Sequence, residues 1–146
     1  PLYDINNSYV IPLNGNGLWG PIWGYISIDK KDCNTVVGTV FDHASETAGL
    51  GAEIIKEKFR SKFEGKQIFN GSEFTSVKVV KGNANGNNEV DGISGSTKTC
   101  DGVSAMLNDC LSGYAAYFQS VVGASAPAVV VETPVADTVS NVQPLN

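Results

Sequence analysis

The sequence predicts an α+β fold, an antiparallel β-sheet with two main helices. Runs of β-branched and aromatic residues occur near the start and in the middle of the chain, as expected for strands. Apolar residues recur at helical spacing in two other segments, which are well separated along the chain. Strands and helices distributed in this way are typical of an α+β domain.

The expected strands are 25–28 and 35–41, and the polar residues 29–34 between them indicate a hairpin turn. Farther along the chain, 73–80 has the composition of a strand, and 90–93 is expected to be a short strand end. The Asn- and Gly-rich residues between these two pieces indicate a flexible connector over 82–88.

The first expected helix covers residues 52–63, where Ile55, Phe59 and Phe63 recur at i, i+4 and i+8 and Gly65 is placed to end it. The second begins near Lys98, with Thr99 or Asp101 as its cap. Its apolar side chains form one continuous stripe: Val103, Met106, Leu107, Cys110, Leu111, Tyr114 and Phe118.

The chain length suffices for one domain with a hydrophobic core. We expect that domain over residues 1–123, followed by an Ala/Pro/Val-rich tail over 124–146. A formal net charge of −5 with only ten Lys and Arg leaves no basic stripe for nucleic acid. No apolar run is long enough to span a membrane and no signal peptide is visible. Because the first residue is Pro1, we expect a trimmed or processed chain.

Three cysteines leave the disulfide state open. Cys100 and Cys110 lie on one expected helix, about 15 Å apart along its axis, too far to form a disulfide. Cys33 could pair with either. A zinc site is not expected, because the chain has one histidine and no Cys-x-x-Cys spacing.

Residues 91–99, Asp-Gly-Ile-Ser-Gly-Ser-Thr-Lys-Thr, lead directly into the second helix. Glycines allow the backbone to approach a ligand closely, hydroxyls and amides donate hydrogen bonds, and a helix N-terminus favours anions. This combination is typical of a phosphate site. The simpler interpretation is a capping segment that only satisfies the helix amides.

Two further segments suggest ligand contacts. Residues 17–21, Gly-Leu-Trp-Gly-Pro, predict either a tight turn with a core tryptophan or an aromatic wall for a flat ligand. Residues 43–51 read His-x-x-Glu-Thr-x-Gly-Leu-Gly, a loop whose glycines permit close backbone approach. There, His43 could be a satisfied structural residue, and Glu46 an acidic residue at a helix start.

The three segments together resemble the FMN-binding domain found in the C subunits of sodium-translocating NADH:quinone reductases. That family has Asp, two variable residues, Ser or Thr, Gly, Ala, Thr, one variable residue, then Thr or Ser. Asp91, Ser94, Gly95, Thr97 and Thr99 fit this pattern, while Ser96 stands where Ala is usual. The family's His-x-x-Glu-Thr-Pro-Gly-Leu-Gly is matched with Ala48 in place of Pro. The resemblance extends from about Gly17 to Leu111.

The resemblance implies an FMN attached by a phosphoester bond to the Thr97 hydroxyl. It also implies that Leu18 and Trp19 wall the isoalloxazine ring, and that the 43–51 loop approaches its polar edge. The implied cofactor-binding residues are Thr97, Ser94, Gly95, Ser96, Lys98, Thr99, Leu18, Trp19, Glu46, Thr47, Gly49 and Leu50. No catalytic acid–base pair is expected, since the cofactor performs the redox chemistry.

The family also implies a cellular context. A separate flavin transferase would move FMN from FAD onto Thr97, and the flavin would pass electrons singly within a sodium pump. The partners would be the pump's other membrane subunits. The full-length protein would be anchored in the inner membrane by a helix absent from this sequence, with the soluble domain on the periplasmic side.

Three other functions are compatible with parts of the sequence. The related G subunit of the ferredoxin:NAD reductase complex, or a free-standing FMN-binding domain, shares the 91–99 motif. A non-catalytic extracellular interaction domain would explain the acidic balance and the Val/Pro tail. A serine hydrolase on Ser94 or Ser96 is the least supported, because the Gly-x-Ser-x-Gly frame is missing.

Overall fold

The computed structural model describes residues 1–125, and residues 126–146, which make up most of the predicted tail, lie outside the described part. The chain divides into two units, 1–115 and 116–146, which are treated separately. Every residue of the three sequence motifs belongs to the first unit.

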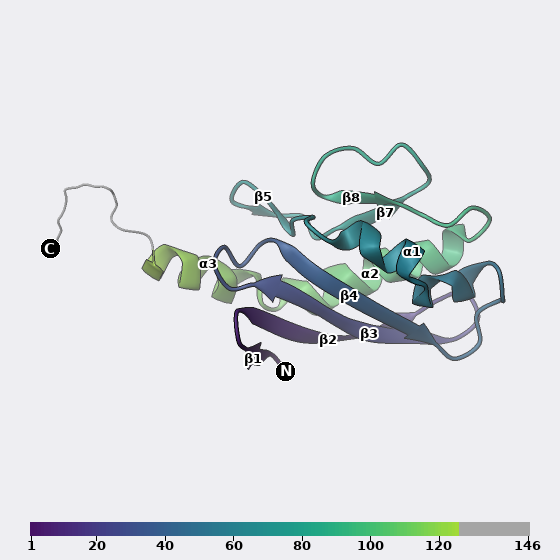
Figure 1. Ribbon diagram of the computed structural model, residues 1–146, viewed down its shortest axis with the longest axis horizontal. Helices are drawn as coiled ribbons and strands as arrows, with labels where there is room; N and C mark the ends of the chain where they lie inside the picture. The colour runs from purple at the N-terminus through teal and green to yellow at the C-terminus, as the bar shows by residue number, and fades with distance from the viewer. Residues whose placement is uncertain (126–146) are drawn as a thin grey trace, which may run out of the picture. The chain divides into compact units, whose positions relative to one another are not determined.

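The first unit is built on a four-stranded antiparallel sheet in which each strand pairs with the next along the chain (Figure 1). Its strands are β1 (Tyr3–Ile5), β2 (Ser8–Asn16), β3 (Pro21–Asp29) and β4 (Val36–His43). The predicted α+β class and antiparallel sheet are confirmed. The first 16 residues look polar in sequence yet supply two strands, because the apolar residues of β2 alternate with polar ones.

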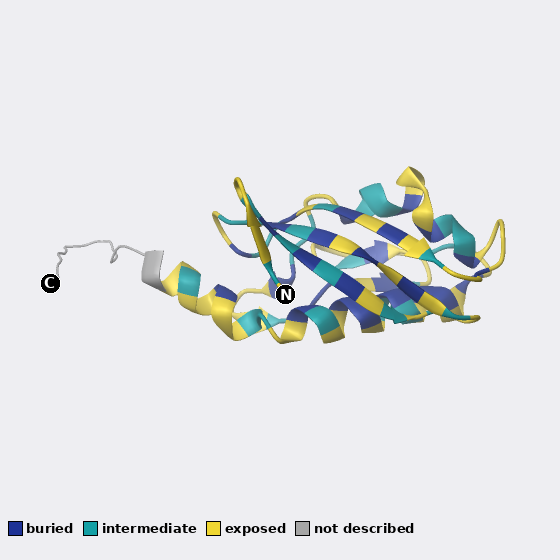
Figure 2. Ribbon diagram, turned by 90° about the horizontal axis from the view of Figure 1, so that it is seen from below, coloured by how far each residue is buried: buried dark blue, intermediate teal, exposed yellow. Residues whose placement is uncertain are grey.

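The sheet has one buried face and one exposed face, as the alternating dark blue and yellow of the strands shows (Figure 2). The buried face includes Ile11, Leu13, Ile22, Ile26 and Ile28. On the opposite face the aromatic side chains of Trp23 and Tyr25 stay exposed. This two-residue period is what an antiparallel sheet with a single core face requires.

The predicted helix over residues 52–63 is three short helical pieces. These are the 3-10 helix η1 (Gly51–Ile55), α1 (Glu57–Arg60) and the 3-10 helix η2 (Ser61–Phe63). The single-helix prediction is wrong because Lys56 has an extended backbone, with ψ at 148°, which interrupts the helical hydrogen bonds. Ile54 is consequently buried and Ile55 exposed, the reverse of the predicted stripe.

The aromatic part of that stripe is confirmed. Phe59 and Phe63 are buried, and both rings contact Phe41 of β4, with centroids 5.8 and 5.3 Å away. The two rings also meet each other in an edge-to-face arrangement at 5.4 Å. Aromatic packing therefore fixes this segment against the sheet although its helix is broken.

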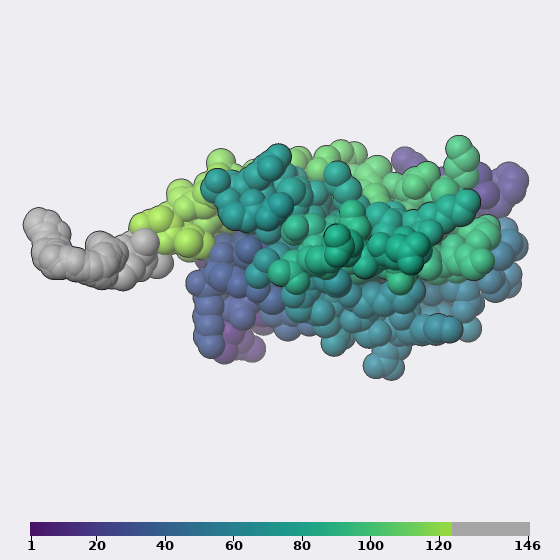
Figure 3. Space-filling model, turned by 90° about the horizontal axis from the view of Figure 1, so that it is seen from above, coloured from purple at the N-terminus to yellow at the C-terminus, as the bar shows by residue number. Residues whose placement is uncertain are grey.

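The middle of the chain adds two small pairs of strands. The hairpin of β5 (Phe69–Asn70) and β6 (Glu73–Phe74) is antiparallel, whereas β7 (Lys78–Val80) and β8 (Glu89–Asp91) pair in parallel. These teal and green segments form the face of the first unit that Figure 3 shows. The predicted connector between β7 and β8 is anchored, since Asp91 Oδ1 accepts from the Ala84 amide (2.7 Å) and Glu89 Oε1 from the Asn85 amide (3.0 Å).

The long helix α2 (Thr97–Ser112) packs on β2 and β7 and lies behind the sheet in Figure 1. Its buried residues are Thr99, Cys100, Val103, Met106, Leu107 and Leu111. Gly102 allows the close contact with β2, because a Cβ there would collide with the Asn16 carbonyl oxygen.

The predicted apolar stripe does not continue through one helix. Helix α2 ends at Ser112, the Tyr114 amide donates to the Leu111 carbonyl (2.9 Å), and a separate helix α3 (Ala115–Ser125) follows. The glycine at position 113 is a weak helix former, which favours a break there. All three cysteines are free thiols. No helix in residues 1–125 has both the length and the apolar character needed to cross a membrane.

Candidate functional site

The carboxylate of Glu46 connects the three sequence motifs. Oε1 accepts hydrogen bonds from the Leu18 amide (3.0 Å) and the Thr99 hydroxyl (2.5 Å), and Oε2 accepts one from the Trp19 amide (2.9 Å). These partners come from the turn before β3 and from the first turn of α2. One buried side chain thus joins segments that are far apart in sequence. We call this set of contacts the Glu46 junction.

The environment of Glu46 keeps it ionised. Burial acts to raise its pKa, but hydrogen bonds from the Thr99 hydroxyl and from the amides of Trp19, Leu18 and Gly20 outweigh burial, so the pKa lies below its ordinary value. An ionised carboxylate only accepts hydrogen bonds, which matches the donors around it. Glu46 and Thr99 were predicted to contact the cofactor. Both are buried and bonded to each other, so they connect elements of the fold.

The junction leaves no room for a side chain at two glycines of the motifs. A Cβ on Gly17 would lie 2.7 Å from the Glu46 carboxylate carbon, and a Cβ on Gly51 would collide with the Thr99 hydroxyl. Larger residues at either position would force the carboxylate away from its donors. Glycine at the start of one motif and at the end of another is therefore a packing requirement.

His43 supports the junction from the end of β4. Its Nδ1 accepts a hydrogen bond from the Glu46 amide (3.0 Å), so this ring nitrogen is already engaged. The structural interpretation of the lone histidine is the one that these contacts support. His43 holds the backbone of Glu46, and Glu46 in turn holds the two other segments.

Three large apolar side chains next to the junction are exposed. Leu18 is 49 % exposed, Trp19 64 % and Leu50 42 %. The expectation of a core tryptophan in the 17–21 turn is therefore wrong for Trp19. Leu50 lies against the loop between β8 and α2, since a Cβ on Gly95 would be 3.3 Å from its Cδ2. The exposed apolar surface thus reaches the start of α2.

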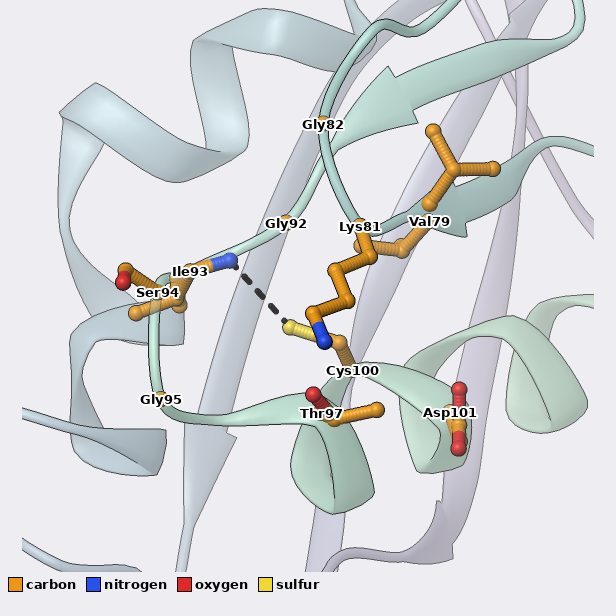
Figure 4. A pocket seen from close by; sticks show the side chains of 11 residues that line it. Val79, Lys81, Gly82, Gly92, Ile93, Ser94, Gly95, Thr97, Cys100 and Asp101 are labelled. Atoms are coloured by element: carbon orange, nitrogen blue, oxygen red, sulfur yellow. Dashed lines mark hydrogen bonds between the residues drawn. The ribbon is translucent and has the colours of Figure 1, made fainter.

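Thr97 is the first residue of α2 and is exposed. It lines a cavity of about 350 Å³ between the end of β7, the loop from β8 to α2 and the first turns of α2 (Figure 4). The cavity is also lined by the side chains of Val79, Lys81, Ile93, Ser94, Cys100 and Asp101. Gly95, with φ of +77°, adopts the left-handed conformation that turns the chain into the helix.

The N-terminus of α2 has no capping side chain and no acidic residue in its first turn to neutralise its positive dipole end. Ser96 occupies the cap position, but its hydroxyl is buried without a hydrogen-bond partner and does not line the cavity. The positive end of the helix dipole is therefore available to an anion at Thr97.

The lysine that lines the cavity with Thr97 is Lys81, and not the expected Lys98. Lys98 is exposed and is absent from the cavity lining, whereas Lys81, which the sequence reasoning missed, lines the cavity. The only sequence signal for it is a lysine directly after the strand-like run 73–80 and before Gly82. Asp91 also differs from its motif neighbours, because its carboxylate holds the 82–88 loop.

The remaining predicted contacts form an exposed turn. The Thr47 carbonyl accepts from the amides of Leu50 and Ala52, both at 3.0 Å, and Gly49 has φ of +78°. This turn presents Leu50 beside Gly95 but does not reach the cavity lining. Thr47 and Gly49 are therefore placed to orient Leu50.

Cys100 lies along the cavity one helical turn after Thr97. Its Sγ accepts a hydrogen bond from the Ile93 amide (3.4 Å), and burial raises the pKa of the thiol, so it stays protonated. It connects the helix to the 92–95 loop. Within residues 1–125 no cluster of His, Cys, Asp or Glu side chains is arranged to hold a metal ion.

Comparisons with known proteins identify the family of this chain. The FMN-binding domain family matches residues 17–112, which span all three motifs. The C subunit of the Na(+)-translocating NADH-quinone reductase of Chlamydia muridarum is 38 % identical over 124 residues, covering 73 % of this chain and 39 % of that protein. The corresponding subunit of Vibrio anguillarum is 40 % identical over 96 residues, covering 64 % of this chain and 37 % of that protein.

Solved structures give the same result. The crystal structure of the corresponding subunit from Parabacteroides distasonis shares 51 % identity with a TM-score of 0.72, covering 76 % of this chain and 56 % of that one. The structure from Shewanella oneidensis shares 30 % identity with a TM-score of 0.67, covering 77 % and 55 %. The chain thus spans less than half the length of the curated relatives it matches. It belongs to the FMN-binding domain family, in the group of NADH-quinone reductase C subunits.

Proposed function

We propose that this chain is the electron-transfer domain of a sodium-translocating NADH:quinone reductase C subunit, and that it carries FMN on the Thr97 hydroxyl through a phosphoester bond. One observation carries the proposal. Thr97 is exposed at the uncapped N-terminus of α2, beside both a cavity and a patch of exposed apolar side chains. A phosphate and a flat ring would find suitable surroundings there.

The residues present fit both ends of the cofactor. The uncapped helix start and the backbone of Gly95 suit the phosphate, which needs donors and close approach. Leu18, Trp19 and Leu50 offer apolar surface for the isoalloxazine ring. When bound, FMN supplies the electron transfer, and the chain holds and orients it.

The chain lacks the means to attach the cofactor unaided. A neutral threonine hydroxyl is a weak nucleophile without an adjacent base. His43 is the single histidine, and its Nδ1 is engaged by the Glu46 amide. This supports the participation of a separate flavin transferase, in which the Thr97 oxygen attacks the FMN phosphorus of FAD and AMP departs. It also disfavours a serine hydrolase, as does the buried Ser96 hydroxyl.

The wider assignment follows the relatives. Proteins named as C subunits of a quinone reductase complex imply that other subunits of that complex are the partners of this chain. We place the domain on the periplasmic side, with the full-length protein anchored in the inner membrane. Covalent attachment would then prevent loss of the flavin from the water-exposed side of the membrane.

The experiment is covalent labelling. The chain is co-expressed with a flavin transferase, denatured in acid and examined for flavin fluorescence that stays with the polypeptide. Mass spectrometry should place one FMN on the peptide that contains Thr97, and Thr97→Ala should abolish the label. Thr47→Ala, which removes another exposed hydroxyl near the site, should retain it. An unlabelled wild-type chain, or a label that survives Thr97→Ala, would refute the proposal.

A further inference from the structure

We infer that Lys81 is the counter-charge for the phosphoester on Thr97, in place of Lys98, the lysine among the cofactor-binding residues that the resemblance implies. The inference rests on the proposed function and extends it to a residue outside the three motifs. It assigns to the β7–β8 connection a direct part in holding the cofactor. The position of Lys81, its lack of another partner and the charges around it support this role.

Lys81 directly follows β7 and lines the same cavity as Thr97. In Figure 4 its side chain extends from the end of β7 across the cavity in the direction of Thr97 and Cys100. The two residues that would face the phosphate come from opposite walls, one from the strand end and one from the helix start. A phosphate held between them would contact both.

The base of Lys81 is fixed relative to α2. The Val79 amide donates to the Ser104 hydroxyl of α2 (2.8 Å), and the Gly92 amide donates to the Val80 carbonyl (2.7 Å). These bonds connect β7 to the helix on one side and to the loop between β8 and α2 on the other. These bonds anchor the strand that precedes Lys81, so the flexible side chain is the part that adjusts to a ligand.

The Lys81 ammonium is not paired with an anion in the described residues. Several other lysines are occupied: Lys30 pairs with Asp4 at 2.6 Å, and Lys62 donates to the Asp91 carbonyl at 3.0 Å. In the part of the chain that the structure describes, Lys81 makes neither an ion pair nor a side-chain hydrogen bond. A lysine that extends into a cavity without a partner is suited to an anionic ligand.

An acidic side chain in the cavity makes a cation there favourable for binding a phosphate. Asp101 also lines the cavity, and its carboxylate would repel a phosphate attached to Thr97. A phosphodiester carries one negative charge, which a single ammonium can balance. The diester and Asp101 together bring two negative charges to the cavity. Lys81 supplies one full positive charge and the helix N-terminus only a partial one, so Lys81 is the larger of the two offsets.

The test compares three variants of the full chain after attachment by the transferase: Lys81→Gln, Lys81→Arg and Lys98→Gln. The first readout is the phosphorus-31 resonance of the attached phosphodiester. We expect it to shift in Lys81→Gln, to stay near the wild-type position in Lys98→Gln and to return toward it in Lys81→Arg. A lysine with a purely structural role would not move this resonance.

The second readout is the initial rate of attachment. At low ionic strength we expect Lys81→Gln to be about 3- to 5-fold slower than wild type, a difference that high salt should remove by screening. Lys98→Gln should change the rate less than about 2-fold, the limit for an exposed charge outside the cavity. The unfolding midpoint of each unlabelled chain reports whether a variant is folded.

The outcomes separate this inference from the proposed function. If the wild-type chain takes up no flavin on Thr97, both fail. If it is labelled normally, but Lys81→Gln leaves the resonance and the rate unchanged, only the assignment of Lys81 fails. That assignment also fails if Lys98→Gln alone reproduces the expected effects. A shifted resonance together with a salt-dependent rate defect, specific to Lys81, supports it.

Discussion

The Glu46 junction and the Thr97 cavity are neighbours on the first turn of α2, yet they are built in opposite ways. The junction is buried, and both oxygens of its carboxylate accept hydrogen bonds. The cavity side is exposed, its helix end is uncapped and its lysine is unpaired. One region stabilises the fold, and the other keeps groups available for a ligand.

The difference arises from helix geometry. Residues two positions apart in an α-helix are separated by about 200° around its axis. Thr97 and Thr99 therefore face different surroundings although both belong to one motif. Thr97 faces outward to the cavity and Thr99 inward to Glu46. The hydroxyl pattern of the motif therefore combines one exposed residue, the proposed attachment point, with one buried residue that supports the fold, and each can be removed separately.

The largest effect on stability should come from the junction. Glu46→Ala removes the acceptor for two part-buried backbone amides and one buried hydroxyl, leaving these donors unsatisfied. We expect the free energy of unfolding, measured by urea denaturation, to fall by about 3 kcal/mol. Glu53→Ala, which removes an acid near the same loop paired only with Lys56 at 3.4 Å, should cost less than about 0.5 kcal/mol. Equal losses of stability in Glu46→Ala and Glu53→Ala would mean that the junction stabilises the fold no more than an exposed ion pair does.

The junction should also make stability depend on pH. Because the pKa of Glu46 is lowered in the folded state, its contribution is fully present above the unfolded pKa of about 4.3 and is lost as pH falls through the lower folded pKa. Glu46→Gln should flatten this part of the stability curve. Burial acts to raise the pKa of Asp32, but hydrogen bonds from Thr35 and Asn34 lower it below its ordinary value. Asp32→Asn is therefore the matched control, because it removes a second carboxylate of lowered pKa that lies outside the junction. A wild-type acid limb that is unchanged in Glu46→Gln would contradict the prediction.

The two threonines should give reciprocal results. Thr99→Val keeps the shape of the side chain but removes the hydroxyl that donates to Glu46, and should destabilise the chain by about 1–2 kcal/mol while attachment continues. Thr97→Val should change stability by less than about 0.5 kcal/mol, as for an exposed site, yet abolish attachment. Urea denaturation and flavin fluorescence of the denatured chain measure the two quantities. Thr99→Val without flavin, or Thr97→Val with it, would remove the distinction.

Local patterns predicted the exposed Thr97 side of α2 better than the junction. The 91–99 motif indicated an exposed hydroxyl at a helix start, and both conditions depend on neighbouring residues. The role of Glu46 depends on amides 27 and 28 residues away and a hydroxyl 53 residues away, which no local pattern reveals. Lys81 was missed for the same reason, because the cavity forms only when β7 is bonded to α2.

The fold shows the same division between local and distant causes. The antiparallel sheet was predictable because β-branched and aromatic composition is a local signal, as in residues 25–28 and 35–41. The helix over 52–63 failed because the spacing of its aromatic residues is retained when Lys56 is extended and the pieces pack separately on Phe41. Packing against the sheet, which periodicity does not describe, decided that segment.

The smallest effect on stability should come from Ser96 at the start of α2, where the family pattern has Ala. Ser96 has a buried hydroxyl with no partner in the described structure, and it does not cap the helix. Ser96→Ala removes a polar group that gains nothing from burial, so we expect the free energy of unfolding to rise by up to about 1 kcal/mol. Flavin attachment at Thr97 should be unchanged, because the hydroxyl does not reach the cavity. Ser94→Ala, which changes an exposed cavity residue instead, should leave stability unaltered. A loss of stability in Ser96→Ala would show that this hydroxyl does cap the helix in solution, and the contrast between the inward and outward faces of the motif would then be weaker.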